Sequence, residues 1–238
     1  MNYYERALEL KDETIANRRH IHKNAETGLD LPKTKAYVME KLTEYGLEPK
    51  DCGYGVTATL GKGGKVLLLR ADMDALPMPE ESGEEFACPT GKEAHTCGHD
   101  FHAAMLLTAA KMLKEKEDTL EGTIKFMFQP AEEKLNGSQS VIDSGLFEKY
   151  QPDFAVGLHC WPDLPAGTVG VRSGSFMASS DSVSLTVKGR GGHGAHPHKS
   201  VDPITAAAYI LAELQTVVSR SVAPLEAAVL TMGRIEGG

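Results

Sequence analysis

The sequence has 238 residues and a formal net charge of −8 at pH 7, because 33 acidic residues outnumber 25 Lys and Arg. Its 41% hydrophobic and 24% charged residues form a globular composition, which excludes a disordered or collagen-like chain. No basic run is present to neutralise phosphates, so nucleic acid and anionic membranes are poor candidates as partners. Charges throughout residues 1–20 and the shortness of every apolar run predict a cytoplasmic protein without an export signal or a membrane span.

The first two thirds of the chain alternate between helical and strand patterns. Apolar residues at helical spacing predict a helix over residues 3–24. Two β-branched and Leu-rich runs, residues 55–60 and 65–69, are joined by a Gly-rich tetrapeptide and predict a hairpin. The remaining predicted elements are helices over residues 33–45, 100–116 and 138–144 and strands over residues 123–129 and 153–158. This alternation predicts an α/β fold with a layered sheet.

The character of the chain changes after Gly167. A low-charge, Ser/Gly-rich junction over residues 173–180 predicts a domain boundary, so we expect one domain over residues 1–178 and a second over residues 179–238. The predicted elements beyond Gly167 are strands over residues 168–171, 181–188 and 227–235, a Gly/His loop over residues 189–198 and a helix over residues 202–219.

Ionisable residues follow three of the predicted strands at the point where each strand ends. They are Asp72 and Asp74, Glu132 and Glu133, and His159. Ligands of open α/β sheets bind beyond the carboxyl ends of the strands, so three such endings predict one shared site. The alternative is that the charges only mark where each strand reaches the surface.

The nine histidines are clustered rather than scattered along the chain. Cys97 and His99 lie two residues apart just before a predicted helix, where the backbone can turn both toward one cation. Thiolate, imidazole and carboxylate together suit zinc and its borderline neighbours better than magnesium or calcium. The alternative is a buried free cysteine beside a helix-capping Asp100. We interpret His20 and His22 as structural, because residues two apart on a helix face nearly opposite sides.

Two adjacent carboxylates, Glu132 and Glu133, follow Pro130 at the end of a predicted strand. Proline cannot donate to the strand ladder, so the strand ends there and presents both carboxylates at the sheet edge. Neighbouring side chains diverge, which predicts different roles: one carboxylate ligates a metal and the other takes a proton from metal-bound water. The alternative is a solvated acidic pair beside Lys134.

Five motifs, taken in order, resemble those of the M20 metallopeptidase family, in particular its amidohydrolase branch of N-acyl-amino-acid and hippurate hydrolases. The motifs are Arg70-Ala71-Asp72-Met73-Asp74-Ala75-Leu76-Pro77, Cys97-Gly98-His99-Asp100-Phe101-His102, Phe128-Gln129-Pro130-Ala131-Glu132-Glu133, Gly157-Leu158-His159 and Gly191-Gly192-His193-Gly194-Ala195-His196-Pro197-His198. The resemblance implies a mixed-sheet, two-metal α/β catalytic domain with an inserted ferredoxin-like lid that also forms a homodimer. It implies hydrolysis of the amide bond of a small N-acyl amino acid through a metal-bridging water.

The resemblance also implies the roles of individual residues. Glu132 would be the general base and Asp72 a group that orients a metal ligand. His193 resembles the lid histidine that reaches the neighbouring subunit's active site and stabilises the oxyanion. The implied cofactors are two divalent ions, zinc, manganese or similar. Their implied ligands are Cys97, His99, Glu133 and His159.

Two features of the chain depart from the family pattern. Ala25 stands where the family's early His-x-x-Pro-Glu stretch has proline. The sequence also stops at Gly238, inside the expected lid and before the family's last metal-ligating histidine, so we read it as truncated at the C-terminus. A non-catalytic fragment with a partial metal site is therefore one alternative. A thiol-based redox protein using Cys97 is another, which the lack of a Cys-x-x-Cys pair disfavours.

Overall fold

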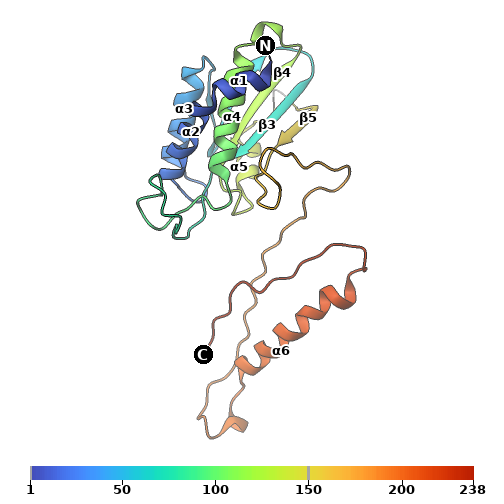
Figure 1. The fold of residues 1–238 in the computed structure, drawn as a ribbon. Helices are drawn as coiled ribbons and strands as arrows, with labels where there is room; N and C mark the ends of the chain where they lie inside the picture. Colours follow the sequence, from blue (N-terminus) through green and yellow to red (C-terminus); the bar gives the residue numbers. More distant parts are fainter. Residues whose placement is uncertain (1, 149–150) are drawn as a thin grey trace. The chain divides into compact units, whose positions relative to one another are not determined.

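The computed structural model describes residues 2–148 and 151–238. The chain divides into two compact units, Met1–Val169 and Gly170–Gly238, which are described separately (Figure 1). The expected domain limit at residues 178/179 stays a prediction.

The first unit is built on one five-stranded mixed sheet with the strand order β1-β2-β4-β3-β5. The strands are β1 (Lys50–Cys52), β2 (Gly55–Gly61), β3 (Val66–Asp72), β4 (Thr123–Gln129) and β5 (Phe154–Gly157). β2 runs antiparallel to β4, whereas β3 is parallel to both β4 and β5. The α/β class predicted from the sequence is confirmed.

The hairpin predicted between residues 55–60 and 65–69 is wrong, because β4 lies between β2 and β3. Gly61 and Val66 both pair with Thr123, from opposite sides. β4 lies between two neighbouring strands, and all seven of its residues are buried. A strand with apolar side chains on both faces is stable in such a position, because other elements then cover both of its faces. The true hairpin is β1 with the start of β2.

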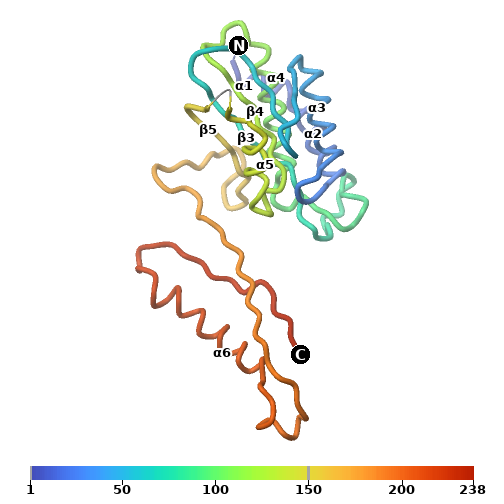
Figure 2. Tube along the Cα trace, turned by 180° about the vertical axis from the view of Figure 1, so that it is seen from behind, coloured from blue at the N-terminus to red at the C-terminus, as the bar shows by residue number. Residues whose placement is uncertain are grey.

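Helices cover both faces of this sheet. The predicted helix over residues 3–24 is two helices, α1 and α2, separated at Leu10; α1 itself buries no residue, whereas Leu10 is buried. The helices of the first unit are α1 (Tyr3–Glu9), α2 (Lys11–Lys23), α3 (Pro32–Glu44), α4 (His99–Lys114), α5 (Gly137–Asp143) and the 3-10 turn Glu117–Thr119. α3 and α4 contact the sheet and α2 packs on α4, while α5 contacts β2 and β4 (Figures 1 and 2).

Successive side chains of β4 point alternately into two hydrophobic cores, one on each face of the sheet. Phe126 and Phe128 are fully buried in the larger core, which includes side chains of α2, α3 and α4. Met127 points the other way, into a smaller core with Val141 of α5. Both faces of the sheet are therefore covered by helices. The edge at which β3, β4 and β5 end is not covered by these two cores and remains available for a site.

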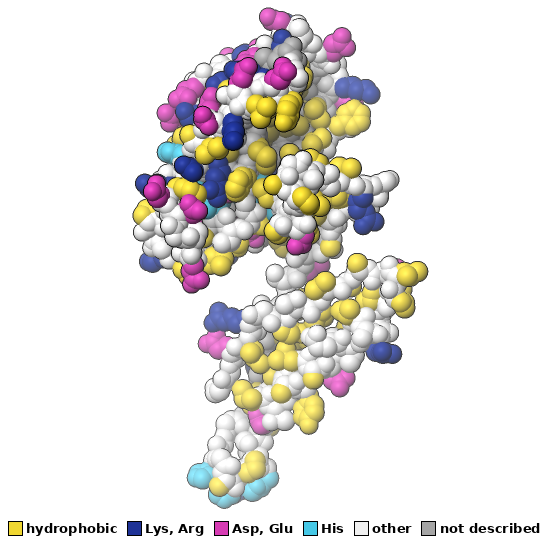
Figure 3. Space-filling model, in the orientation of Figure 1, with side chains coloured by type: hydrophobic (Ala, Val, Ile, Leu, Met, Phe, Trp, Pro, Cys, Tyr) yellow, Lys and Arg dark blue, Asp and Glu magenta, His cyan; other side chains and the backbone are white. Residues whose placement is uncertain are grey.

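The second unit contains the helix α6 (Pro203–Thr216), a following π-helical turn (Val217–Ser221) and a 3-10 turn (Pro197–Lys199). The strands predicted over residues 168–171, 181–188 and 227–235 are not formed in the structure. Among the described residues of the unit, strand-like pairing is limited to a bridge between Arg190 and Val201. An extended segment becomes a strand only when a neighbour pairs with its backbone, and these segments have no such neighbour in the part of the chain that the structure describes. Apolar side chains are visible on the surface of this unit (Figure 3). In the extended segments, Val183 is 89% exposed and Val229 is 90% exposed.

No helix within the described ranges is both long and apolar enough to cross a membrane.

Candidate metal centre

Three parallel strands end at the same edge of the sheet. Asp72 at the end of β3 is in register with Gln129 at the end of β4, and Gly157 at the end of β5 pairs with Arg70. The residues that follow each strand therefore share this edge, as the sequence predicted for Asp72, Glu132, Glu133 and His159.

Gly98, whose backbone has a left-handed conformation, brings Cys97 and His99 to the same edge of the sheet. Gly98 has φ +85°, and a Cβ at this position would lie 3.2 Å from the Cβ of Cys160. Both the backbone conformation and the close approach favour glycine. The sharp turn ends the preceding loop at Cys97 and starts α4 at His99.

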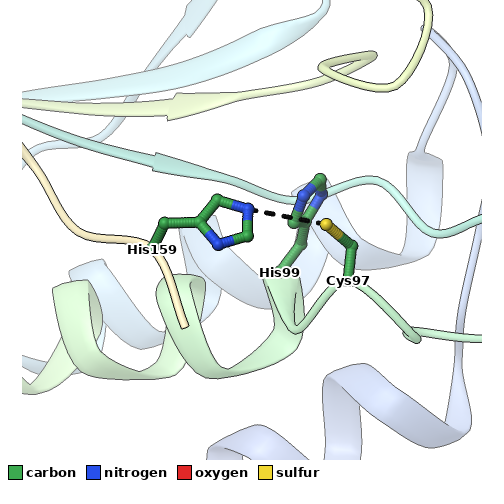
Figure 4. Close-up of side chains that lie close together, drawn as sticks. All are labelled: Cys97, His99 and His159. Carbon is green, nitrogen blue, oxygen red and sulfur yellow. Dashed lines mark hydrogen bonds between the residues drawn. The ribbon is translucent and has the colours of Figure 1, made fainter. Parts of the chain in front are cut away.

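Four other residues predicted for the site lie close to His99. The Sγ of Cys97 lies 3.5 Å from Nε2 of His159 (Figure 4). Cys97, His99 and His159 each offer a ligand atom, and these atoms lie within 4.8 Å of one another. A second group with the same spread consists of His99, Glu132 and Glu133. Because His99 belongs to both groups, the two places at which a cation could bind are next to each other.

The buried imidazole of His99 is surrounded by carboxylates. Its Nδ1 lies 3.4 Å from Oδ1 of Asp74, and its Nε2 lies 3.8 Å from oxygens of both Glu132 and Glu133. Among the described residues, neither ring nitrogen has a hydrogen-bond partner, and neither does the buried Oε1 of Glu133. Burial lowers the pKa of His99, but the neighbouring carboxylates Asp74 and Asp72 raise it overall. Buried polar atoms without partners are rare in proteins, so these atoms fit direct bonds to a cation.

The surroundings of the Cys97 thiol also fit a bound cation. Burial and the nearby Glu133 carboxylate raise its pKa to about 12. A thiolate here needs a compensating positive ion, and the raised pKa disfavours the redox alternative, which requires a reactive thiolate. Sulfur, imidazole nitrogen and carboxylate oxygen are together the donors that zinc and similar divalent ions accept. The residues present therefore fit a divalent metal.

Asp72 lies beside the centre but does not hydrogen-bond to His99. Its Oδ1 is 2.6 Å from Nδ1 of His102, and its Oδ2 accepts a hydrogen bond from Arg70 at 2.7 Å. Burial opposes ionisation, yet the His102 hydrogen bond and the Arg70 charge together lower the pKa of Asp72 to about 2. Asp72 is therefore a buried anion.

Asp74 is a buried residue of the site for which the motifs predicted no separate role. Its two carboxylate oxygens accept hydrogen bonds from the backbone N–H groups of Glu132, at 2.9 Å, and Glu133, at 3.1 Å. The turn that carries both glutamates is thereby fixed to the end of β3. The available signal was the Asp72/Asp74 spacing, since residues two apart in an extended segment share a face.

His20, His22 and His193 lie outside the candidate metal groups found among the described residues. His22 is buried between Asp100, at 2.7 Å, and Glu80, at 2.8 Å, which fits its structural interpretation. His20 is exposed and stacks on Tyr37 with ring centroids 3.8 Å apart. His193 is exposed on a loop of the second unit, where its Nδ1 accepts a hydrogen bond from the N–H of Ala195.

Known proteins resemble this chain over nearly its whole length. It is 42% identical over 233 residues to an N-acetyl-L-cysteine deacetylase of Bacillus subtilis, and 41% identical over 245 residues to a hippurate hydrolase of Campylobacter jejuni. These matches cover 96% and 100% of the chain, but the chain spans only 56% and 63% of the length of these two relatives.

Similarity to solved structures agrees with these sequence matches. A Bacillus subtilis protein described as a dinuclear metal-binding peptidase of the M20 family matches 68% of the chain with a TM-score of 0.65 and 36% identity; the match covers 46% of that protein. A structure from methicillin-resistant Staphylococcus aureus matches 100% of the chain with a TM-score of 0.81 and 32% identity, and the match covers 65% of it. The family model for peptidase family M20/M25/M40 matches residues 68–232, well over half of the chain. Together with the carboxylate-rich centre at the sheet edge, this match establishes that the chain belongs to peptidase family M20/M25/M40.

Proposed function

We propose that the protein hydrolyses the amide bond of small N-acyl amino acids with the help of two divalent metal ions. The observation that carries the proposal is the position of His99, a buried imidazole that belongs at once to a Cys97/His159 group and to a Glu132/Glu133 group. Similar proteins named as a deacetylase and a hippurate hydrolase support an N-acyl amino acid as the substrate class.

The metal pair would be held by four residues of this chain, with zinc or manganese as the expected ions. When bound, such ions polarise the amide carbonyl and acidify water. The unpartnered Oε1 of Glu133 and ring nitrogens of His99 support ligand roles for both residues. The proposed ligands are Cys97, His99, Glu133 and His159.

Glu132 is the proposed general base. Its side chain is 36% exposed, compared with 22% for Glu133, so it can exchange protons with a substrate in the open edge of the site. Asp74 fixes the backbone of both glutamates, so the two carboxylates keep different directions and different roles. Glu132 would take a proton from the attacking water and pass it to the leaving amine.

The second unit is proposed to be the beginning of a ferredoxin-like lid that forms a homodimer. The exposed Gly/His loop that carries His193 is suited to donate a hydrogen bond to the oxyanion in the partner's active site. Four free cysteines suit a reducing compartment, so we propose the cytoplasm as the location.

An assay of metal-depleted protein tests the proposed function. N-acetyl, N-benzoyl and N-succinyl amino acids are supplied with zinc or manganese, and the released amine is measured, with metal binding followed in parallel by calorimetry. We expect hydrolysis that depends on added metal and is abolished by a chelator. Tight metal binding without release of amine from any substrate would contradict the proposal and favour the non-catalytic fragment.

A further inference from the structure

A chain of hydrogen bonds connects the interior of the sheet to His159, the ligand whose own side chain is exposed. It begins at Arg70, which donates to Asp72 at 2.7 Å, and Asp72 in turn lies 2.6 Å from Nδ1 of His102. The other ring nitrogen of His102, Nε2, lies 2.8 Å from the backbone N–H of Cys160. Finally, the carbonyl oxygen of Cys160 lies 2.7 Å from Nδ1 of His159.

These contacts fix the tautomers of both histidines. The N–H of Cys160 can only donate, so Nε2 of His102 must accept and the ring proton must be on Nδ1, where it is donated to Asp72. The Cys160 carbonyl can only accept, so His159 carries its proton on Nδ1. Nε2 of His159 therefore carries the lone pair of the ring and accepts the 3.5 Å hydrogen bond from the Cys97 thiol, so it faces another proposed ligand.

His102 is consequently unavailable as a ligand, even though its ring lies within the compact group formed with Asp72 and His99. Both its nitrogens are already engaged, and its side chain is buried. His159 has different surroundings: its side chain is exposed, and its ring meets the His102 ring edge to face with centroids 4.6 Å apart. Its Nδ1 hydrogen-bonds to the Cys160 peptide, which His102 also holds, so His102 orients His159 both by ring contact and through this peptide.

We propose that His102 is a positioning residue that, together with Asp72, holds the Cys160 peptide so that His159 presents Nε2 to the metal. Asp72 thus acts on a ligand across two intervening groups, the His102 ring and the Cys160 peptide, and not by bonding to His99. The inference rests on the proposed function only in taking His159 as a ligand.

Two substitutions of His102 test this proposal. His102→Leu removes both hydrogen bonds, whereas the amide of His102→Gln can donate to Asp72 and accept from Cys160. The exposed His20→Gln on α2 serves as the matched control. The first readout is the ¹⁵N chemical shifts of the His159 ring in metal-free protein, which report its tautomer without any requirement for metal or activity. The second readout is zinc affinity by competition with a chromophoric chelator.

We expect His102→Leu to convert His159 from the Nδ1–H form to a mixture of tautomers and to weaken zinc binding by about 10- to 100-fold, the usual effect of losing a partner behind a ligand. His102→Gln should retain most of the native tautomer and affinity, and His20→Gln all of both. An unchanged His159 tautomer in folded His102→Leu, or equal losses in the Leu and Gln variants, would overturn the proposal.

If His102→Leu does not fold, Asp72→Asn provides the test, because it keeps the shape of the carboxylate and removes its charge. The tautomer of His159 in metal-free protein is then decisive, since the charge of Asp72 also bears directly on a nearby cation. A shift of His159 away from the Nδ1–H form is expected, and an unaltered spectrum would overturn the proposal. Loss of hydrolase activity alone, with tautomer and zinc affinity intact, would count against the proposed function and not against this inference.

Discussion

Glu132→Gln is expected to slow hydrolysis of an N-acyl amino acid by at least about 100-fold, the lower range for loss of general acid–base catalysis. The amide has nearly the same shape as the carboxylate but cannot take a proton from water. The backbone N–H of residue 132 would still be held by Asp74, so the turn and its neighbour Glu133 should stay in place. The effect should therefore fall on kcat, with metal content unchanged.

The matched control is Glu121→Gln, which makes the same change at an exposed position of the first unit. Turnover is measured at saturating substrate, and bound metal is measured by mass spectrometry on the same samples. Turnover within a few-fold of the unsubstituted protein would show that Glu132 is not the base. Loss of metal together with activity would instead indicate that Glu132 is a ligand.

His22→Leu is expected to lower the free energy of unfolding by about 3 kcal/mol or more, the cost of removing one member of a buried ion pair. His22 lies between the carboxylates of Asp100 and Glu80, both of which are nearly inaccessible to solvent. Leucine would remove the group that bridges these two carboxylates, and although Asp100 would keep its ion pair with Arg18, Glu80 would lose its partner in the ion pair. Urea unfolding of the first unit measures the change.

The same network predicts how stability depends on pH. The hydrogen bond to Asp100 is the main cause that raises the pKa of His22, against the effect of burial, so the folded state favours the protonated ring. This contribution is complete below the ordinary histidine pKa of about 6.5 and is lost as the pH rises through the raised value. Unfolding free energy should therefore fall on the alkaline side in the unsubstituted protein and change much less in His22→Leu.

His20→Leu, on the same helix two residues away, is the control for both measurements. Its ring is exposed and stacks on Tyr37, so we expect a change of less than about 1 kcal/mol. Partial burial lowers the pKa of His20, so the loss of this ring should leave the fall in stability on the alkaline side unaltered. Equal stability of the two variants would contradict the account of His22.

Local sequence patterns predicted most elements of the first unit. The strand over residues 123–129 has the limits that the pattern indicated, and α4 begins one residue before its predicted start. The clustering of ionisable residues at strand ends also predicted which side chains would share an edge, because the carboxyl ends of parallel strands meet there.

The order of strands could not be read in the same way. β2 and β3 are adjacent in sequence, but β4, all of whose residues are buried, lies between them. The contacts that support the site were also beyond local patterns. Asp74 acts through backbone N–H groups, and His102 acts through the Cys160 peptide. The sequence shows these two side chains, but it does not show which backbone groups they bond.

The extended segments of the second unit show a further limit. Val183 and Val229 lie in runs with strand-like composition, yet both are almost fully exposed. A run of β-branched and apolar residues indicates that a segment suits a pleated sheet surface. A strand forms only if another segment lies in position to pair with it. Among the described residues these segments have no such neighbour.

The most direct test of the metal centre is a crystal structure of the protein grown with zinc, with data collected on both sides of the zinc absorption edge. We predict two anomalous peaks adjoining His99, with Cys97 Sγ at about 2.3 Å from an ion and the imidazole nitrogens of His99 and His159 at about 2.0–2.1 Å. Glu133 should contribute a carboxylate oxygen, while His102 should remain bonded to Asp72 and Cys160. Zinc bound only at other residues, or no peak at this sheet edge at saturating zinc, would contradict the account.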